Sequence, residues 1–261
     1  MSEPGRWSDL GDRIGVGAVV AAIGLFCVWA GGLVFAALTI AITGIIIWEL
    51  VRMLDPDAPA VALGVGSAAA LAVAILLPPG YSLPLILAPV FVGFGQMDRH
   101  RATFSIFAIM VLVAGFGLYV LRAEFGLIWM FWLVLVVMVT DVFGYFAGRF
   151  IGGPRFWPRI SPKKTWSGTI AGWVGAAFVG VAFLGPAGGD FQLVSVSVAI
   201  AMASQMGDVA ESAVKRRVGV KDSSSLLPGH GGLFDRFDGM LGAAVFLLLV
   251  AQLIDFPPVG P

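Results

Sequence analysis

Apolar runs long enough to cross a lipid bilayer are the feature that most restricts how this chain folds. A membrane-spanning helix needs about 20 consecutive, mostly apolar residues. Runs of this kind recur from Ile14 towards the C-terminus, interrupted only by short polar or Pro- and Gly-containing breaks. In lipid, a helix satisfies all of its backbone hydrogen bonds internally. The pattern therefore predicts an all-α integral membrane protein.

The composition agrees with a membrane protein and argues against several other classes. Hydrophobic residues make up 59% of the 261 residues and charged residues 12%, and the mean hydropathy is +0.95. These values are outside the range typical of soluble domains. The 16 basic and 16 acidic residues balance, which gives no indication of a nucleic-acid partner. The single cysteine, Cys27, excludes an intrachain disulfide and a cysteine-based zinc site.

The apolar runs predict about nine transmembrane helices. Breaks such as Pro78-Pro79-Gly80 and Gly185-Pro186 mark turns, because proline lacks a backbone donor and glycine frees the backbone. The first run continues almost to Trp48 across a Gly31-Gly32 break, so we expect a retained helix rather than a cleaved signal peptide. The predicted helices cover 14–30, 33–53, 60–78, 82–96, 103–121, 126–148, 168–186, 191–207 and 239–256.

The basic residues predict the orientation of these helices, because cytoplasmic loops are enriched in Lys and Arg. With a cytoplasmic N-terminus, 15 of the 16 Lys and Arg residues fall inside and only Arg122 falls outside. This distribution supports an odd number of spans and a C-terminus outside the cytoplasm. We expect residues 1–125 to form scaffold helices. We expect residues 126–261, with cytoplasmic loops 149–167 and 208–238, to form the catalytic region around a polar cavity open to the cytoplasm.

Two carboxylates lie within apolar runs. Asp141 is costly in such a segment and normally faces a polar cavity, so we favour a functional role over simple pairing with a nearby Arg or Lys. Gly144 and Gly148 on the same helix form a small-xxx-small pair that permits close helix packing. Glu49 lies beside Trp48 near a helix end, and we interpret it as a headgroup-level side chain without a catalytic role.

A basic segment, residues 148–168, follows the Asp141 helix. Five cationic residues alternate there with aromatic residues and prolines, and the segment contains Ser161-Pro162-Lys163-Lys164-Thr165. Basic charge alone would only mark a cytoplasmic loop. Lys and Arg are also the side chains that hold phosphate groups, so Lys163 and Lys164 are candidates for binding a polyanion.

The most polar stretch, residues 204–239, lies between two apolar runs. If it begins as the end of a helix, one face carries Ser204, Asp208, Glu211, Ser212 and Lys215. Asp235 and Asp238 are spaced i, i+3 just before the last span. Carboxylate oxygens suit Mg²⁺, and bringing Asp208 against Asp235 would create a magnesium site at the membrane surface. The alternative for each aspartate alone is a salt bridge to a nearby cation.

The turn Pro228-Gly229-His230-Gly231-Gly232 lies within this stretch. Its glycines permit a nest of backbone N–H groups that could hold phosphate, and a turn with a merely structural histidine is the alternative. The chain has only two histidines, so a histidine-based metal site is not expected. Ser212-x-x-Lys215 has the spacing of a serine acylase pair, but the partner motifs are missing.

The order of these residues resembles the phosphatidate cytidylyltransferase (CDP-diacylglycerol synthase) family. Two positions differ from the residue that the family often has: Gly239 stands in place of Ser, and Ser167 in place of Glu or Gln. The resemblance rests on Ser212-x-x-Lys215-Arg216, Lys221-Asp222, the SPKKT element at 161–165, and Leu227-Pro228-Gly229-His230-Gly231-Gly232-x-x-Asp235-Arg236-x-Asp238.

The resemblance implies the reaction CTP + phosphatidate → CDP-diacylglycerol + pyrophosphate. It implies Mg²⁺, with room for a second cation, held by Asp208 and Asp235. The catalytic residues that it implies beside these two are Asp141, Lys215, Asp222 and Asp238. The substrate-binding residues that it implies are Ser161, Lys163, Lys164, Thr165, Ser212, Arg216, Lys221, Gly229, His230, Gly231, Gly232 and Arg236.

The same resemblance implies a bacterial inner (plasma) membrane protein with its active site facing the cytoplasm. Membrane lipids are then expected partners, and a homodimer is one option for assembly. Two other function classes remain open. A transporter could also carry intramembrane carboxylates, but it would not need a basic, Gly-rich loop dense in phosphate donors. A related CTP-dependent enzyme that acts on another lipid phosphate or on a lipid alcohol would share the nucleotide chemistry.

Overall fold

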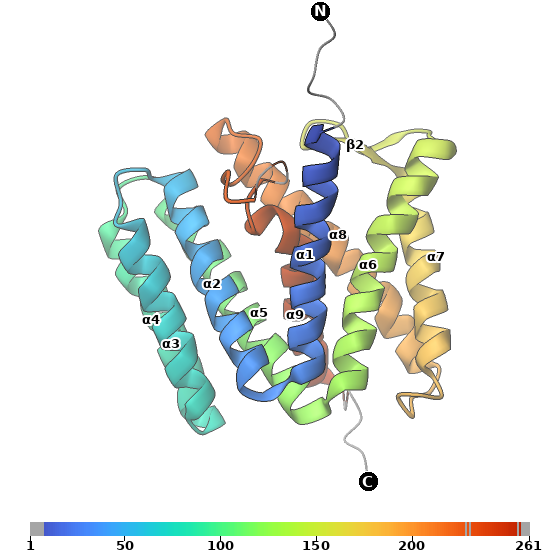
Figure 1. Ribbon diagram of the computed structural model, residues 1–261, viewed down its shortest axis with the longest axis horizontal. Coiled ribbons are helices and arrows are strands. Elements are labelled where there is room, and N and C mark those ends of the chain that lie inside the picture. Colours follow the sequence, from blue (N-terminus) through green and yellow to red (C-terminus); the bar gives the residue numbers. More distant parts are fainter. Residues whose placement is uncertain (1–7, 228, 230, 255, 257–261) are drawn as a thin grey trace, which may run out of the picture. The chain divides into compact units, whose positions relative to one another are not determined.

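The computed structural model describes residues 8–227, 229, 231–254 and 256 of this chain, with side chains from residue 17 onward except 79, 80 and 83. Within this part, the chain forms nine α-helices, one π-helical turn and two short strands (Figure 1). In order, these are α1 (Ser8–Ala30), α2 (Gly32–Leu54), α3 (Ala60–Leu76), α4 (Pro79–Gln96), α5 (Arg101–Val120), η1 (Leu121–Phe125), α6 (Leu127–Phe150), β1 (Arg155–Trp157), β2 (Ser161–Thr165), α7 (Trp166–Phe183), α8 (Gln192–Val218) and α9 (Phe234–Leu253).

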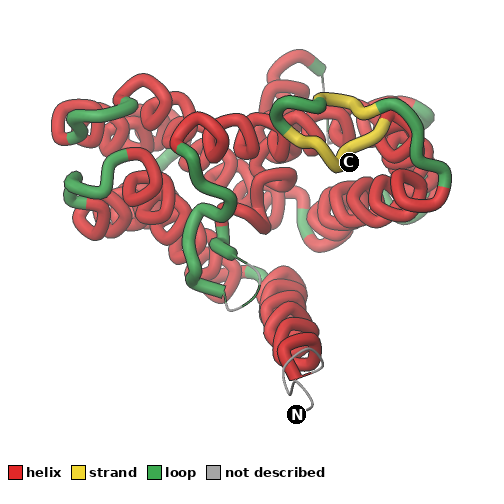
Figure 2. Tube along the Cα trace, turned by 90° about the horizontal axis from the view of Figure 1, so that it is seen from above, coloured by secondary structure: helices red, strands yellow, loops and turns green. Residues whose placement is uncertain are grey.

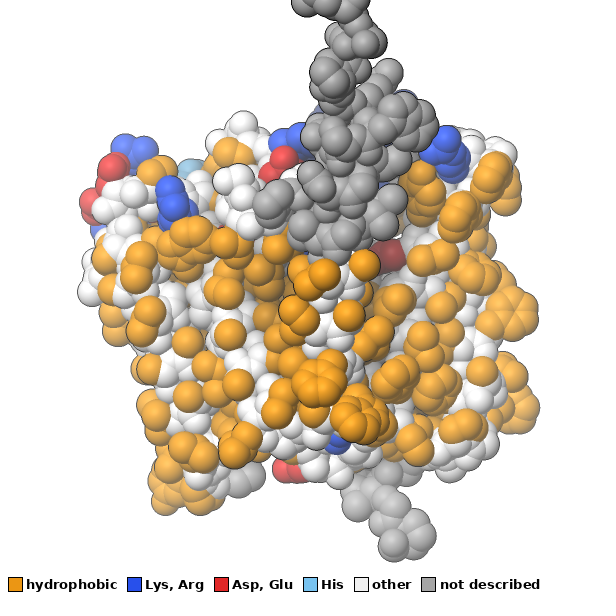
Figure 3. Space-filling view, in the orientation of Figure 1, with side chains coloured by type: hydrophobic (Ala, Val, Ile, Leu, Met, Phe, Trp, Pro, Cys, Tyr) orange, Lys and Arg blue, Asp and Glu red, His pale blue; other side chains and the backbone are white. Residues whose placement is uncertain are grey.

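The helical character predicted from the apolar runs is confirmed. Among the described residues, six helices are long and apolar enough to cross a membrane: α2, α5 with η1, α6, α7, α8 and α9. The apolar parts of α1, α3 and α4 are shorter. Hydrophobic side chains cover the flanks of the helices in Figure 3, whereas charged side chains gather near helix ends. Large apolar side chains such as Phe91, Ile106 and Phe178 are exposed, as expected for surfaces that face lipid. The exact number of spans stays a prediction.

The chain divides into two compact units, each with its own core. Unit 1 comprises Met1–Leu112 and Val220–Arg236, and unit 2 comprises Val113–Gly219 and Phe237–Pro261. The polar segment 220–236 therefore belongs to the same compact unit as the N-terminal helices. The expected division at residue 125 concerns which part is catalytic, and it stays a prediction.

In unit 1, glycines bring the first helices together. A Cβ added at Gly64 on α3 would lie 2.8 Å from the carbonyl oxygen of Gly44 on α2. The two helices therefore pack backbone to backbone, which small residues permit in membrane proteins. Ile46, Ile47 and Leu50 of α2 are fully buried in the same unit. This packing fixes the helix that carries Glu49.

In unit 2, α6 and α7 pack through the pair predicted from the sequence. A Cβ at Gly144 would lie 3.4 Å from the carbonyl oxygen of Gly168, and a Cβ at Gly148 would lie 3.0 Å from Thr165 Oγ1. The predicted role of these two glycines in close helix packing is confirmed. Further along α6, the buried Trp132 Nε1 donates a hydrogen bond to Ser197 Oγ on α8 at 2.9 Å. The three helices form the frame of the site in this unit.

The segment expected as a basic loop is partly a β-hairpin. β1 and β2 pair antiparallel, with Arg155 opposite Thr165 and Trp157 opposite Ser161. They are the yellow segment in Figure 2. Thr165 then caps α7, because its Oγ1 accepts a hydrogen bond from the Gly168 N–H at 3.2 Å. The hairpin gives Lys164 a fixed strand position instead of a place in an irregular loop.

Candidate active site

The polar face of α8 is the centre of the site in unit 2. The membrane-spanning helix was predicted to cover residues 191–207. In the structure, α8 continues to Val218 and ends at Gly219. Gly219 adopts a left-handed conformation with φ of 78°, which glycine adopts without steric cost. The predicted helical face from Ser204 to Lys215 therefore lies on one continuous helix.

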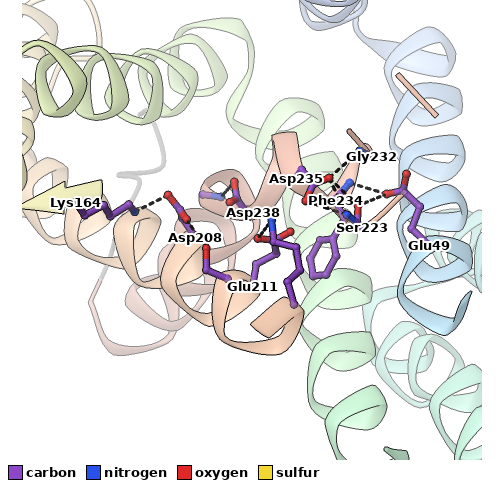
Figure 4. A network of polar contacts seen from close by, with 12 residues as sticks. Glu49, Lys164, Asp208, Glu211, Ser223, Gly232, Phe234, Asp235 and Asp238 are labelled. Carbon is purple, nitrogen blue, oxygen red and sulfur yellow. Dashed lines mark hydrogen bonds and ion pairs between the residues drawn. The ribbon is translucent and has the colours of Figure 1, made fainter. Parts of the chain in front are cut away.

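Lys164 from β2 reaches Asp208 on α8. Its Nζ lies 2.5 Å from Asp208 Oδ2, and the two side chains are only 24% and 31% exposed (Figure 4). Ser212, one helical turn further along, donates a hydrogen bond to Asp208 Oδ1 at 3.3 Å. The structure thus brings Lys164 from the basic segment to Asp208 and Ser212, which the sequence had placed on one helix face.

Asp141 and Asp238 belong to the same electrostatic cluster. Both carboxylates lie within electrostatic reach of Asp208 and Lys164. The backbone of α9 comes close to α8 because Gly207 has no side chain, and a Cβ there would collide with the carbonyl oxygen of Asp238. Three carboxylates thus share the field of one lysine, and this imbalance favours the binding of further positive charge.

A second ion pair lies along the same helix. Lys215 Nζ is 2.6 Å from Glu211 Oε2, and Glu211 is fully buried. Removing one partner of a buried pair leaves an uncompensated charge, which is strongly destabilising. The Lys215 ammonium, which we expected to act on substrate, is engaged with Glu211 in this arrangement. Its catalytic role stays a prediction.

The two positions that depart from the family pattern have local explanations. A Cβ at Gly239 would lie 2.7 Å from Ser204 Oγ, so the Ser204 hydroxyl occupies space that a serine at 239 would need. Ser204 Oγ is buried and has no hydrogen-bond partner within the described part of the chain. Ser167 Oγ donates to the carbonyl oxygen of Gly152 at 2.5 Å, which ties the start of α7 to the segment before β1.

In unit 1, Asp235 holds the turn that precedes α9. Its Oδ2 accepts hydrogen bonds from the backbone N–H groups of Gly232 at 2.7 Å and of Ser223 at 2.9 Å. The Ser223 hydroxyl donates to the same oxygen at 3.1 Å. A Cβ at Gly231 would lie 2.6 Å from this oxygen, and its φ is 83°. The motif glycines therefore let the turn close over Asp235.

Glu49, which we expected at headgroup level without a role in the site, is fully buried. Its Oε1 accepts hydrogen bonds from Ser224 Oγ at 2.6 Å and from Leu233 N–H at 3.0 Å. Its Oε2 accepts a hydrogen bond from Phe234 N–H at 2.7 Å (Figure 4). Ser223 Oγ lies 3.4 Å from the same oxygen, so its one proton is shared between Glu49 and Asp235. The expected headgroup-level position was wrong because these partners lie 174 to 185 positions further along the chain. A carboxylate in an apolar run, the signal that singled out Asp141, was the available clue.

Other predicted residues take more peripheral positions or fall outside the described part. His230 and Pro228 lie outside the described residues. Asp208 and Asp235 belong to different units, so their pairing stays a prediction. Ser161 is half-buried on β2. The predicted residues that are exposed are Lys163, Arg216, Lys221, Asp222, Gly229 and Arg236.

The oxygen ligands present suit Mg²⁺. This ion prefers carboxylate and other hard oxygen ligands, and it usually takes one or two carboxylates, with water and substrate phosphates completing its shell. Among the described residues, no group of three His, Cys, Asp or Glu side chains is arranged to hold a metal ion. Asp208 has Ser212 and the unpartnered Ser204 hydroxyl on the same helix face. These residues fit a Mg²⁺ ion that arrives with a phosphate ligand.

Comparison with known proteins gives one consistent family. The model of the cytidylyltransferase family matches residues 11–254. A phosphatidate cytidylyltransferase of Brucella abortus biovar 1 (strain 9-941) is 36% identical over an alignment of 261 residues that covers 97% of each chain. A phosphatidate cytidylyltransferase of Bacillus subtilis (strain 168) is 31% identical over 94% of this chain and 98% of its own length. One from Helicobacter pylori (strain ATCC 700392 / 26695) is 41% identical over 52% of this chain and 51% of its own length.

Proposed function

This chain belongs to the cytidylyltransferase family, and we propose that it transfers the cytidylyl group of CTP to phosphatidate. The products are CDP-diacylglycerol and pyrophosphate. The observation that carries the proposal is whole-length similarity to relatives that bear the name of this activity. The site geometry supports it, since Lys164 of β2 lies near the carboxylates Asp141, Asp208 and Asp238 of three helices in unit 2, and such groups suit phosphate and metal chemistry.

The reaction requires one bond to form and one to break. An oxygen of the phosphatidate phosphate attacks the α-phosphorus of CTP, and the bond from this phosphorus to the bridging oxygen of pyrophosphate breaks. The electron pair leaves with pyrophosphate. The attacking oxygen is already anionic, so no strong general base is needed. Rate acceleration then depends on alignment of the two substrates and on neutralisation of charge at the phosphates.

The cationic residues of unit 2 supply part of this neutralisation. Lys164 is held in place by its strand and by its contact with Asp208. An ammonium that already pairs with an anionic oxygen at the site is suited to engage a phosphate oxygen as well. Lys163 on the same strand is exposed and would meet the triphosphate from the solvent side.

Asp208 and Asp235 would hold Mg²⁺, with Asp141, Asp222 and Asp238 as supporting carboxylates. The ion would supply positive charge at the CTP phosphates where negative charge develops. Asp208 and its hydrogen-bonded Ser212 would orient this ligand shell. The backbone N–H groups of Gly232 and Ser223, which donate to Asp235, would hold this carboxylate in a fixed orientation.

We also infer that the chain crosses a bacterial inner membrane nine times with a cytoplasmic N-terminus. The apolar helices and the one-sided distribution of Lys and Arg support this arrangement. CTP would then reach the site from the cytoplasm, and the lipid substrate would enter sideways between helices. The active site would face the cytoplasm, where CTP is available.

The decisive experiment supplies purified protein with CTP, phosphatidate and Mg²⁺, and follows CDP-diacylglycerol and pyrophosphate together. We expect the two products in equal amounts, no reaction without phosphatidate, and loss of activity with a chelator that excess Mg²⁺ restores. Asp208→Asn protein serves as the control for contaminating activity. Absence of both products with active phosphatidate and CTP would refute the proposal.

Acceptor lipids separate the related enzyme classes. A lipid alcohol in place of phosphatidate should give no product. Transfer to a lipid alcohol, with CDP released, would assign the chain to a CTP-dependent kinase instead. Transport of a solute by reconstituted protein without CTP turnover would favour the transporter alternative.

A further inference from the structure

Glu49 on α2 is a buried carboxylate that the proposed chemistry does not use. It lies in a helix long and apolar enough to cross a membrane, and its side chain is 0% exposed. Burial of a carboxylate in such an environment costs free energy unless hydrogen-bond donors compensate it. The four donors that surround Glu49 come from segment 223–234.

The donors require Glu49 to act as an acceptor at both oxygens. Two of them are the backbone N–H groups of Leu233 and Phe234, at the start of α9, where the helix carries partial positive charge. The other two are the hydroxyls of Ser223 and Ser224. A carboxylate is acceptor-only at both oxygens, whereas a glutamine side chain must present its amide NH₂ donor in place of one of them.

The same segment positions Asp235. The three successive N–H groups of Gly232, Leu233 and Phe234 are divided between two carboxylates, the first donating to Asp235 and the other two to Glu49. Ser223 contacts both, because its Oγ lies 3.1 Å from Asp235 Oδ2 and 3.4 Å from Glu49 Oε2 (Figure 4).

The contacts with Glu49 and the packing of Phe234 fix the position of the start of α9. Phe234 is fully buried and packs edge to face against Phe107 of α5, with ring centroids 6.1 Å apart. At Gly232, a Cβ would lie 2.5 Å from Glu49 Oε1, so the turn backbone lies directly against the carboxylate. A shift of Glu49 would therefore displace the residues that hold Asp235.

We propose that Glu49 is a positioning residue for the cytidylyl transfer: its carboxylate, supplied by the second helix, fixes segment 223–234 so that Asp235 is correctly placed. This inference rests on the proposed function, since it assigns Asp235 to the same reaction. It gives an N-terminal helix, which we expected to be scaffold, a defined part in the site.

Three variants separate charge from shape. Glu49→Gln keeps the size of the side chain but places an amide NH₂ donor among N–H and O–H donors. Glu49→Asp keeps an acceptor-only carboxylate but shortens the side chain by one methylene. Asp55→Asn is the matched control, because Asp55 is also buried in unit 1 and also accepts two backbone N–H groups, those of Asp98 and Arg99.

We expect Glu49→Gln to lower kcat at least tenfold per folded protein, and Glu49→Asp to retain more activity than Glu49→Gln. Asp55→Asn should keep kcat within twofold, even where its melting temperature falls as far as that of Glu49→Gln. Hydrogen exchange supplies a readout that is independent of turnover. Peptides covering 229–236 should exchange faster in Glu49→Gln, while peptides from α3 and α4 keep their protection.

Each outcome of these experiments supports or overturns the positioning role of Glu49. Wild-type kcat in folded Glu49→Gln, or lower activity in Glu49→Asp than in Glu49→Gln, would overturn the positioning role. An equal loss of kcat in Asp55→Asn would show that general destabilisation is the cause and would also overturn it. If the wild-type protein forms no CDP-diacylglycerol, the proposed function fails separately, and unchanged exchange at 229–236 in Glu49→Gln would then refute the anchor itself.

Discussion

At the residue scale, the carboxylates of the site differ in what compensates their charge. Asp208 contacts a lysine ammonium and a serine hydroxyl, whereas Asp235 accepts backbone N–H groups and a hydroxyl from its own turn. Side-chain groups of Lys164 and Ser212 therefore compensate Asp208, whereas backbone groups contribute to the compensation of Asp235. Substitutions at the two positions test the same reaction through different local effects.

Asp208→Asn and Asp235→Asn should each lower kcat at least a hundredfold. This corresponds to a loss of about 2.7 kcal/mol of transition-state stabilisation. If both residues serve one ligand shell, the double variant should be little worse than either single variant, because residues that act as a unit are strongly non-additive. Steady-state kinetics at several Mg²⁺ concentrations measure this. Near-wild-type turnover in a folded single variant would remove that residue from the site.

Lys164 and Lys163 are neighbours on one strand but differ in surroundings. Lys164 is mostly buried beside Asp208, whereas Lys163 is exposed. Lys164→Ala should lower kcat/KM for CTP at least tenfold, because it removes the ammonium nearest to the carboxylates. Lys163→Ala should have a smaller effect, since water screens an exposed charge. The kinetics are measured with CTP as the varied substrate. If both variants match wild type, the basic segment 148–168 has no role in substrate binding.

At the element scale, residues at the ends of helices and in the connections between them determine where helices begin, end and meet. Thr165 caps α7, and Gly219 ends α8. Asp55, in the connection between α2 and α3, joins a second connection, because its Oδ2 accepts the N–H groups of Asp98 at 2.8 Å and Arg99 at 3.0 Å. These contacts hold the ends of α2 and α5 together within unit 1.

The Asp55 contacts predict a pH dependence of stability. The backbone N–H of Arg99 is the main cause that lowers the pKa of Asp55 below its ordinary value of 3.8, and burial acts in the opposite direction. Because the folded-state pKa is lower, the stabilisation is fully present above about pH 4 and is lost as the pH falls through the folded-state pKa.

Asp55→Asn should therefore lower the free energy of unfolding by about 1–3 kcal/mol at pH 7. The difference from wild type should shrink as the pH falls below 4. Thermal melting in detergent between pH 7 and pH 3 measures both effects. A difference that stays constant over this range would contradict the assigned cause.

At the scale of the whole molecule, the distribution of charge predicts sidedness. Fifteen of the 16 Lys and Arg residues fall on one side of a nine-span arrangement, and such a bias sets membrane orientation. Single cysteines at positions 164 and 221 of a variant that lacks Cys27 should react only with reagent from the cytoplasmic side. A cysteine at position 260, beyond the described residues, should react only from outside. Labelling of positions 164 and 221 from opposite sides would disprove the arrangement.

The sequence alone was sufficient to predict the helices and the family motifs, because both depend on local patterns. Apolar length predicts a spanning helix wherever the partner helices lie. Fixed spacing likewise placed Ser204, Asp208 and Lys215 on one helix face, and the small-xxx-small pair marked the contact of α6 with α7. Lys164 and Asp208 were both predicted as site residues, although nothing in the sequence paired them.

Tertiary structure decided which distant groups satisfy one another. Glu49 has the same local context as a headgroup-level glutamate, and only the approach of segment 223–234 identifies it as the anchor of the turn. The hairpin that presents Lys164 to Asp208 depends on strand pairing, and the close contact of α8 with α9 depends on Gly207 facing another backbone. Apolar periodicity reports transfer into lipid residue by residue, whereas a buried polar group is stable only where specific donors reach it. Those donors come from parts of the chain that no local pattern relates.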